Sequence, residues 1–450
     1  MMFGNATRRN AAGFKPVSLD ALNFLLADVR GALGPYVNVF LVTQQHWSQS
    51  AVGLMLTVGG LLGLALQTPI GAAIDATRAK RGVIVAALAV TAISAVAIAM
   101  APVLVANSLM AIAGDVLGPA VASLTLGLFK PQELARRIGR NSAFDHGGNV
   151  IIALVAGGVG WMLGQRSVFL LAPFFAALAA AAVLSIPDRA IDHQRARGAD
   201  SLEGSAQDVR GWSVLLECRP LVIFACCAMP FHFANAPLLP LVGQKLALAN
   251  PEFATAMMSS CIVAAQLVML PIALFVGWTA DRIGRKPILL ASFAILPIRA
   301  VLYTFSDNSA WLIAVQLLDG VGAGIFGALT PLLLADLMRG TGRYNLAQGA
   351  VGTVQGIGAS SSGLVAGIIV DHLGYNAAFT TAAAVAAVAF AVLAIAMPET
   401  APRRRSVKPD PGLVSRCSGR ERLKHLRIGG AANWRLGLYR VASGENGQHV

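Results

Sequence analysis

The sequence predicts an all-α, polytopic membrane protein with about twelve transmembrane helices in two pseudo-symmetric six-helix bundles. Hydrophobic residues make up 56% of the 450 residues and charged residues 13%, about half of the share usual in soluble domains. Apolar runs of about 20 residues, the length that a helix needs to cross a bilayer, recur along the chain. Matched positions in the two halves of the chain indicate an internal repeat.

Six apolar runs are expected to form a first bundle over residues 19–186, with spans near 19–43, 50–73, 82–101, 104–128, 144–164 and 167–186. Six more are expected to form a second bundle over residues 219–400, with spans near 219–243, 254–276, 287–305, 310–336, 346–370 and 376–397. The basic segment 1–18 lacks a signal-peptide cleavage pattern, so we interpret the first run as a retained span.

Two polar segments lie outside these bundles. The stretch 187–218 divides the spans six and six and has too few apolar residues for a core of its own, so we expect a cytoplasmic linker. The tail 401–450 is basic and without clear periodicity. We expect it to be disordered near an anionic membrane surface, and a separate binding module is the alternative.

The distribution of cations predicts the orientation. If the N-terminus is inside, the outer connections contain only Arg166 and Lys245. The inner connections contain many more cations, namely Arg78, Lys80, Arg81, Lys130, Arg136, Arg137, Arg140, Arg189, Arg195, Arg197, Arg210, Arg282, Arg285, Lys286, Arg339 and Arg343. Short loops rich in Lys and Arg stay in the cytoplasm, so both termini are expected there, in a cell (plasma or inner) membrane. The net charge of +13 is therefore explained by the orientation of the loops in the membrane, and no nucleic-acid partner is expected. The excess of Arg over Lys and the abundance of Ala favour a bacterial source.

Four pairs of similar features recur at a nearly constant spacing in the two halves. The paired positions lie 202 to 206 residues apart and are Gly71 and Gly277, Asp115 and Asp319, Ile138 and Thr341, and Pro35 and Pro237. Such an offset predicts internal duplication, a construction that is common in secondary transporters.

The stretch "GWTADRIGRKP", residues 277–287, lies between the expected spans eight and nine. It matches the pattern G-x-x-x-D-R-x-G-R-[RK] of the major facilitator superfamily. With the twelve spans, the six-plus-six division and the long central linker, the chain resembles a member of that family over roughly residues 19–400. The resemblance implies the fold of that family and a cytoplasmic gate in which this loop latches neighbouring helices.

The expected gating motif comprises Gly277, Asp281, Arg282, Gly284, Arg285 and Lys286, with Gly71, Asp75 and Arg78 in the first-half copy. Gly277 would allow close helix approach, Asp281 suits a helix terminus or an Arg partner, and Gly284 permits a tight turn. In the first-half copy Ala76 replaces an Arg of the pattern and Arg78 replaces a Gly, so a latch there is less well supported. The alternative is that these cations act only as topology determinants.

Polar side chains within the spans are the candidates for a substrate and proton pathway, because charges are costly in hydrocarbon. They are Asp28, Arg30, Asp115, His232, Asn235, Gln316 and Asp319. All lie on spans 1, 4, 7 and 10, which the resemblance implies line a central cavity.

Asp28 is the best single candidate for a protonatable coupling site, and its alternative role is that of a structural ion-pair partner. Asp28 and Arg30 are two residues apart, so each needs a partner elsewhere. For Asp115 and Asp319, which occupy matched positions in the repeat, we favour a role in the cavity. His232 favours a hydrogen bond between helices over proton transfer, and Arg299, midway along span nine, favours structural pairing.

Small residues are concentrated in spans five and eleven. The stretches "VAGGVGWMLG" (155–164) and "VQGIGASSSGLVAG" (354–367) occupy matching positions and predict close, sliding helix contacts.

Together these features predict a secondary active transporter that moves a small organic solute by alternating access. We expect a monomer in the lipid bilayer, coupled to protons, with export slightly favoured. Uptake of a sugar or organic acid is the alternative, since "PET" at 398–400 resembles a sugar-porter ending. No P-loop, H-E-x-x-H or G-x-S-x-G motif is visible, so no enzyme activity, cofactor or metal is expected. A non-transporting membrane sensor or partner subunit with the same fold is the alternative of another class.

Overall fold

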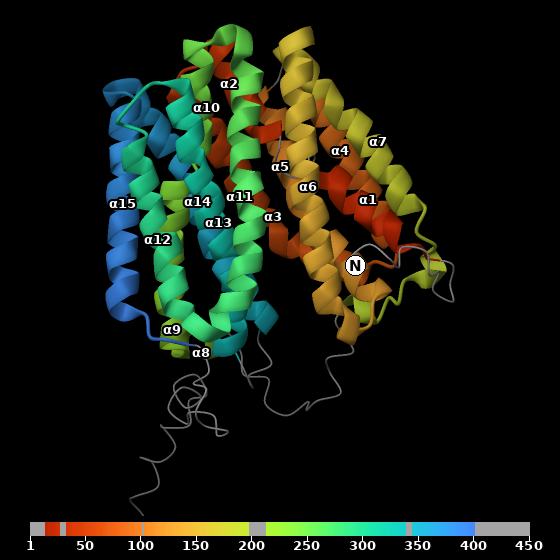
Figure 1. Ribbon diagram of the computed structural model, residues 1–450. Helices are drawn as coiled ribbons and strands as arrows, with labels where there is room; N and C mark the ends of the chain where they lie inside the picture. The colour runs from red at the N-terminus through yellow and green to blue at the C-terminus, as the bar shows by residue number, and fades with distance from the viewer. Residues whose placement is uncertain (1–13, 28–32, 101–102, 198–212, 339–343, 401–450) are drawn as a thin grey trace, which may run out of the picture.

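The computed structural model describes residues 14–27, 33–100, 103–197, 213–338 and 344–400, and within these ranges the chain forms helices and no β-strand (Figure 1). The expected tail 401–450, much of the expected linker, and two of the candidate residues, Asp28 and Arg30, lie outside the described residues.

The helices of the first half follow one another up and down the molecule. They are α1 (Pro16–Ala27), α2 (Leu33–Thr43), α3 (Gln49–Ala76), α4 (Lys80–Met100), α5 (Val103–Leu128), α6 (Pro131–Leu163) and α7 (Leu171–Leu184), with a 3-10 helix η2 (Gln165–Leu170) before α7. Two short 3-10 helices, η3 (Asp188–Ala190) and η4 (Arg195–Arg197), follow α7 in the linker region.

The second half repeats this arrangement. After the short α8 (Ser213–Glu217) come α9 (Arg219–Asn235), α10 (Leu238–Ala249), α11 (Ala254–Ile283), α12 (Arg285–Leu302), α13 (Ser309–Leu337), α14 (Tyr344–Leu373) and α15 (Tyr375–Ala396), with the 3-10 helix η6 (Pro251–Phe253) before α11. The break between α9 and α10 falls at Pro237, the counterpart of Pro35 in the repeat.

Ten helical segments of the described chain are long and apolar enough to cross a membrane. The remaining two expected spans are the pair α1 and α2, which are individually short, and α12, which carries Arg285, Lys286 and Arg299 among its 18 residues. The predicted fold class, with about twelve spans in two groups of six, is confirmed.

The fifth span begins earlier than predicted. We expected it to start near residue 144, but α6 begins at Pro131, whose fixed φ suits the first turn of a helix. The polar segment 131–143 is helical because Arg137 and Arg140 find a carboxylate partner on α1, as described below. His146, only two residues after the predicted start, consequently lies nearly halfway along α6.

Side-chain caps define several helix ends. The Ser48 hydroxyl accepts a hydrogen bond from the Ala51 N–H at the start of α3, and Asn308 accepts from the N–H groups of Ala310 and Trp311 at the start of α13. Gly284, between α11 and α12, has φ +102°, a conformation that favours glycine over other residues.

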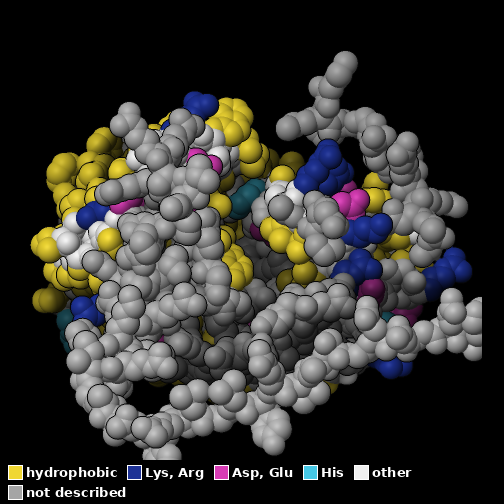
Figure 2. Space-filling model, turned by 90° about the horizontal axis from the view of Figure 1, so that it is seen from below, with side chains coloured by type: hydrophobic (Ala, Val, Ile, Leu, Met, Phe, Trp, Pro, Cys, Tyr) yellow, Lys and Arg dark blue, Asp and Glu magenta, His cyan; other side chains and the backbone are white. Residues whose placement is uncertain are grey.

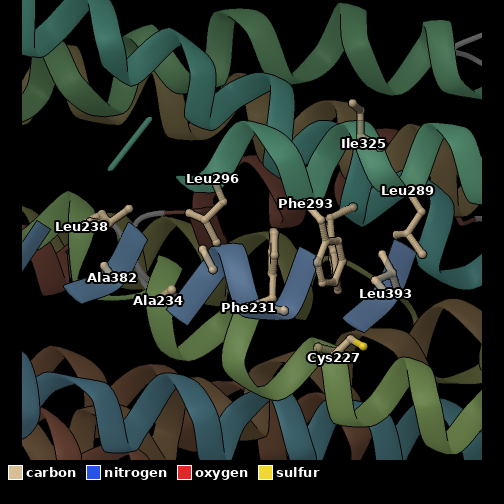
Figure 3. Packing of buried hydrophobic residues seen from close by; sticks show 14 of the residues in the cluster. Cys227, Phe231, Ala234, Leu238, Leu289, Phe293, Leu296, Ile325, Ala382 and Leu393 are labelled. Atoms are coloured by element: carbon tan, nitrogen blue, oxygen red, sulfur yellow. The ribbon is translucent and has the colours of Figure 1, made fainter. Parts of the chain in front are cut away.

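Each half has its own apolar core. In the second half the rings of Phe231 and Phe293 lie against each other, with centroids 4.4 Å apart, and Leu289, Leu296 and Leu393 belong to the same cluster (Figure 3). In the first half the core joins α1, α4, α5 and α7 around residues such as Leu22 and Leu88.

A further buried cluster crosses between the halves at one end of the molecule. It combines residues of α2, such as Tyr36 and Phe40, with Met258 and Ile262 of α11. We call this the upper end, because it is at the top of Figure 1; it contains the connections near residues 44–48 and 303–308. The opposite, lower end contains the connections near residues 77–79 and 284.

The lower end differs from the upper end in charge and shape. Figure 2, viewed from below, shows Lys and Arg side chains on this face and a hollow between the two halves. The described part of the linker packs here: Ser123 of α5 donates to the Ala196 carbonyl at 2.8 Å. Nearby, the Asp192 carboxylate accepts from the backbone N–H groups of Arg195 and Gln194, and these bonds lower the pKa of that carboxyl from its usual value.

Candidate functional site

The two halves are joined at the upper end by α3 and α14. The Thr57 hydroxyl donates to the Ser360 carbonyl at 2.7 Å and accepts from the Leu364 N–H at 3.1 Å. A Cβ added at Gly53 would overlap the backbone of Gly363. The small residues predicted in span eleven therefore do permit a close helix contact, and that contact lies between the halves.

Asp371 belongs to the same contact, or seam, between α3 and α14. It stands near the end of α14, and its carboxylate accepts from the N–H groups of Gln49, at 2.9 Å, and Ser50, at 2.8 Å. These N–H groups belong to the first turn of α3, where helix N–H groups lack partners within the helix and the helix dipole favours a negative charge. An acid of one half thus caps a helix of the other half.

A second seam joins α6 and α11. His146 Nδ1 and Gln266 Oε1 lie 2.8 Å apart across it. Nearer the upper end, a Cβ at Gly157 would overlap Ser259 and one at Gly160 would overlap Thr255, so the glycines predicted in span five also permit close contact.

Five side chains of the second half form one hydrogen-bonded cluster: Asn235 of α9, Arg299 and Tyr303 of α12, and Gln316 and Asp319 of α13. Arg299 is 2% exposed, forms an ion pair with Asp319, and donates from Nη2 to Asn235 Oδ1 at 2.7 Å. Gln316 donates from Nε2 to Asp319 Oδ2 at 2.9 Å and accepts from the Tyr303 hydroxyl. The structure thus brings three of the predicted pathway residues together and gives Arg299 the partner expected of it.

The repeat-related carboxylates Asp115 and Asp319 have different surroundings. Asp319 faces a guanidinium. Asp115, on α5, is partly buried against Gly63 of α3 and has no hydrogen bond or ion pair with any residue that the structure describes. A buried carboxylate without a counter-charge is far easier to neutralise by a proton than one paired with Arg.

His232 is packed among aromatic rings, but its hydrogen bond differs from the one expected. Its Nδ1 lies 3.0 Å from the Ala228 carbonyl of its own helix, and its ring contacts the rings of Phe231 and Phe326. The hydrogen bond is within α9, so the expected bond between two helices is wrong, whereas the packing contact with α13 is present.

The gating loop of the second half is held by ion pairs within that half. Arg285 is buried and bridges Asp281, at 2.7 Å, and Asp336 of α13, at 3.0 Å. Arg282 and Lys286 have no ion pair in the described part of the chain. The Arg partner expected for Asp281 is present.

Gly284 and Gly277 have different surroundings. The tight turn at Gly284 is present, but the close helix approach expected at Gly277 is wrong, since nothing that the structure describes lies within 4 Å of a Cβ built there. Gly277 instead lies on an exposed face of α11.

Glu399 was not predicted as part of this loop. Its two carboxylate oxygens accept from the N–H groups of Arg285, at 2.8 Å, and Lys286, at 3.2 Å, and so cap α12. In the first half Asp188 bonds to Arg81 at the start of α4 at 3.1 Å. The segments "IPD" (186–188) and "MPE" (397–399), each after the last helix of its half, carry these acids and were the available signal.

The first-half copy of the motif is only partly described. Gly71 and Asp75 lie near the end of α3, but the surroundings of Gly71 and the side chain of Asp75 are outside the description, and Arg78 is exposed. The buried cation of this loop is Lys80, which donates to the Ile74 carbonyl.

Asp20, also missed from the sequence, joins α1 to α6. It is buried, contacts Arg137 at 2.7 Å, and accepts two hydrogen bonds from Arg140 at 2.9 and 2.7 Å. We had interpreted both arginines as topology determinants in a loop. A lone Asp near the start of an apolar run was the only sequence signal for this cluster.

Comparisons with a family model and with individual proteins point to the same family. The family model described as Major Facilitator Superfamily matches residues 19–269 and 233–443. An MFS-type transporter of Mycobacterium tuberculosis (strain H37Rv) is 48% identical over 401 residues, which are 88% of this chain and 96% of that protein. The methyl viologen resistance protein SmvA of Salmonella typhimurium is 30% identical over 142 residues, 31% of this chain and 28% of that protein.

Solved structures share the fold at low sequence identity. The nucleoside transporter NupG (D323A mutant) superimposes with a TM-score of 0.67 at 16% identity, over 84% of this chain and 99% of that one. A D-xylose-proton symporter superimposes with a TM-score of 0.66 at 14% identity, over 86% of this chain and 97% of that one.

Proposed function

Because this chain belongs to the major facilitator superfamily and is a multi-pass membrane transporter of that family, we propose that it exports a small organic solute by alternating access coupled to protons. The observation that carries the proposal is the asymmetry of the two ends. The halves are bonded to each other at the upper end through Thr57, Ser360 and Asp371, and the lower face is hollowed between them (Figure 2). Rocking of two halves about a central site reverses such an asymmetry.

The orientation follows from charge. The upper end carries Arg166 of η2 and Lys245 of α10, whereas the lower end carries the cations of the gating loops. By the positive-inside rule the lower end faces the cytoplasm, which supports an inward-facing state. The same distribution of cations is the reason to propose that both termini lie inside. The mycobacterial relative supports a bacterial inner membrane as the location, and we propose a monomer as the working unit.

We assign proton coupling first to Asp115. Asp115 lies on a span that lines the cavity in this family and has no partner in the described part of the chain. Asp28 stays a candidate on the sequence argument alone. Asp319 is better suited to hold α12 and α13 together, because Arg299 neutralises it.

Export is favoured over uptake for one reason. Part of the chain resembles a methyl viologen resistance protein, and removal of a toxic compound is one route to resistance. Uptake of a sugar or organic acid together with protons is the alternative. The resemblance of "PET" to a sugar-porter ending does not support it further, because Glu399 has a structural role as a helix cap.

Proteoliposome flux tests the proposal. Wild-type protein should move solutes from a broad panel when a pH gradient is imposed, and absence of flux over that panel would indicate a sensor or partner subunit instead. Asp115→Asn or Asp28→Asn should abolish gradient-driven flux and leave solute exchange intact, whereas Asp307→Asn, a matched change of an exposed upper-end carboxylate, should retain both. Wild-type pH dependence in both pathway variants would refute the coupling assignment.

A further inference from the structure

A cavity of about 310 Å³ lies between the two halves. The first half contributes parts of α2 and α3, and the second contributes parts of α10 and α14 together with the Pro237 break. Its volume is at the lower end of the range for small-molecule sites. The ionic cluster of Arg299 and Asp319 does not line it.

Two buried amide side chains line the cavity, and the oxygen atom of each lacks a hydrogen-bond partner in the described chain. Asn38 of α2 and Gln244 of α10 are each 2% exposed. Asn38 Oδ1 and Gln244 Oε1 have no hydrogen-bond partner among the described residues. Buried polar atoms of native proteins are nearly always paired, so two unpaired acceptors on one cavity are an unusual combination.

The other residues that line the cavity indicate that a bound solute is uncharged. The polar groups on the wall are amides and hydroxyls, including Gln49, Ser360 and Ser362, and the lining residues that the structure describes include no Asp, Glu, Lys, Arg or His. A full charge placed there would be removed from water without a counter-charge, which is costly in a membrane protein. Apolar residues such as Val52 and Leu56 cover the rest.

We propose that this cavity binds an uncharged polar solute, and that Asn38 and Gln244 recognise it with their amide groups, each half contributing one hydrogen bond. This inference rests on the proposed transport function and specifies its substrate class. Since the two amides belong to different halves, the solute bridges the halves and stabilises the state in which the upper end is closed.

The first test needs no identified solute. Replacing an unsatisfied buried amide by an apolar side chain of similar shape removes a penalty, so Asn38→Leu and Gln244→Met should each raise the melting temperature of the empty protein, by about 1–3 °C. Gln316→Met is the matched control, because that buried glutamine is fully bonded to Asp319 and Tyr303 and its loss should lower the melting temperature. If both cavity variants melt below wild type, as Gln316→Met does, the amides are structural and the proposal is overturned.

The second test identifies the solute class. Purified protein is screened by thermal shift with uncharged polyols, nucleosides and amides, each beside a matched anionic and cationic derivative. Uncharged members should stabilise wild type, and each cavity variant should bind them about tenfold more weakly, the loss of one hydrogen bond. Selective stabilisation by charged members, or by none, overturns the proposal. Flux that persists unchanged in both cavity variants overturns this assignment and leaves transport standing, whereas absence of flux in wild type overturns transport itself.

Discussion

Asp371→Ala should open the upper end. In the closed state the carboxylate accepts hydrogen bonds from the N–H groups of Gln49 and Ser50, and it stands at the positive end of the α3 dipole. A hydrogen bond to a charged group that is shielded from solvent contributes about 1.5–3 kcal/mol to stability. Asp371 is exposed, so solvent screening reduces the combined contribution of its two hydrogen bonds and the helix dipole to about 1–2 kcal/mol. Because these bonds join the two halves, their loss should shift the population toward the outward-facing state by about 5- to 30-fold.

Electron paramagnetic resonance distances measure this shift directly. Spin labels at Gln44 and Glu252, both exposed at the upper end on different halves, should show a longer-distance population that grows in Asp371→Ala. Asp307→Ala is the control, since Asp307 is an exposed acid at the same end that pairs with Lys245 within one half. An unchanged distance distribution in Asp371→Ala, or an equal change in the control, would refute the assignment of Asp371 to the closed seam.

Three further predictions concern stability and closure. Gly53→Ala should widen the same distance distribution, because its Cβ would overlap the backbone of the facing helix, whereas Gly352→Ala, which faces open space, should leave it unchanged. Arg299→Leu should lower stability to thermal unfolding by about 3–5 kcal/mol by leaving the mostly buried Asp319 without a counter-charge, and the double variant with Asp319→Leu should recover part of that loss; additive losses would contradict the pairing. Glu399→Ala should cost about 1 kcal/mol in the same assay through loss of the α12 cap, and no change in melting temperature would argue against the cap.

The twelve spans could be predicted because length and hydropathy determine them locally. The start of α6 could not, because its polar first turns are stabilised by Asp20, a residue more than 100 positions away that neutralises Arg137 and Arg140. A polar stretch that pairs with a distant helix resembles a loop in the sequence. The same limitation concealed the roles of Asp188 and Glu399, whose partners lie at the starts of other helices.

The candidate pathway residues could be named from the sequence, but their partners could not. Which face of a helix a residue occupies depends on packing between helices, so Asp115 and Asp319 looked equivalent although only Asp319 meets an arginine. Asn38 and Gln244 were not named among the polar side chains of the spans, since the sequence does not show which buried amides lack a partner. Their significance comes from the cavity that they share.

The central claim is that one protein alternates between closure at its upper end and closure at its lower end. Distances across both ends, measured in the same preparation, test it most directly: Gln44 to Glu252 above, and Glu133 to Ala335 below, all exposed positions. The account predicts that, as pH is varied, the upper distance lengthens whenever the lower distance shortens, with matching populations. Two distances that change independently, or a lower end that never closes, would contradict alternating access in this protein.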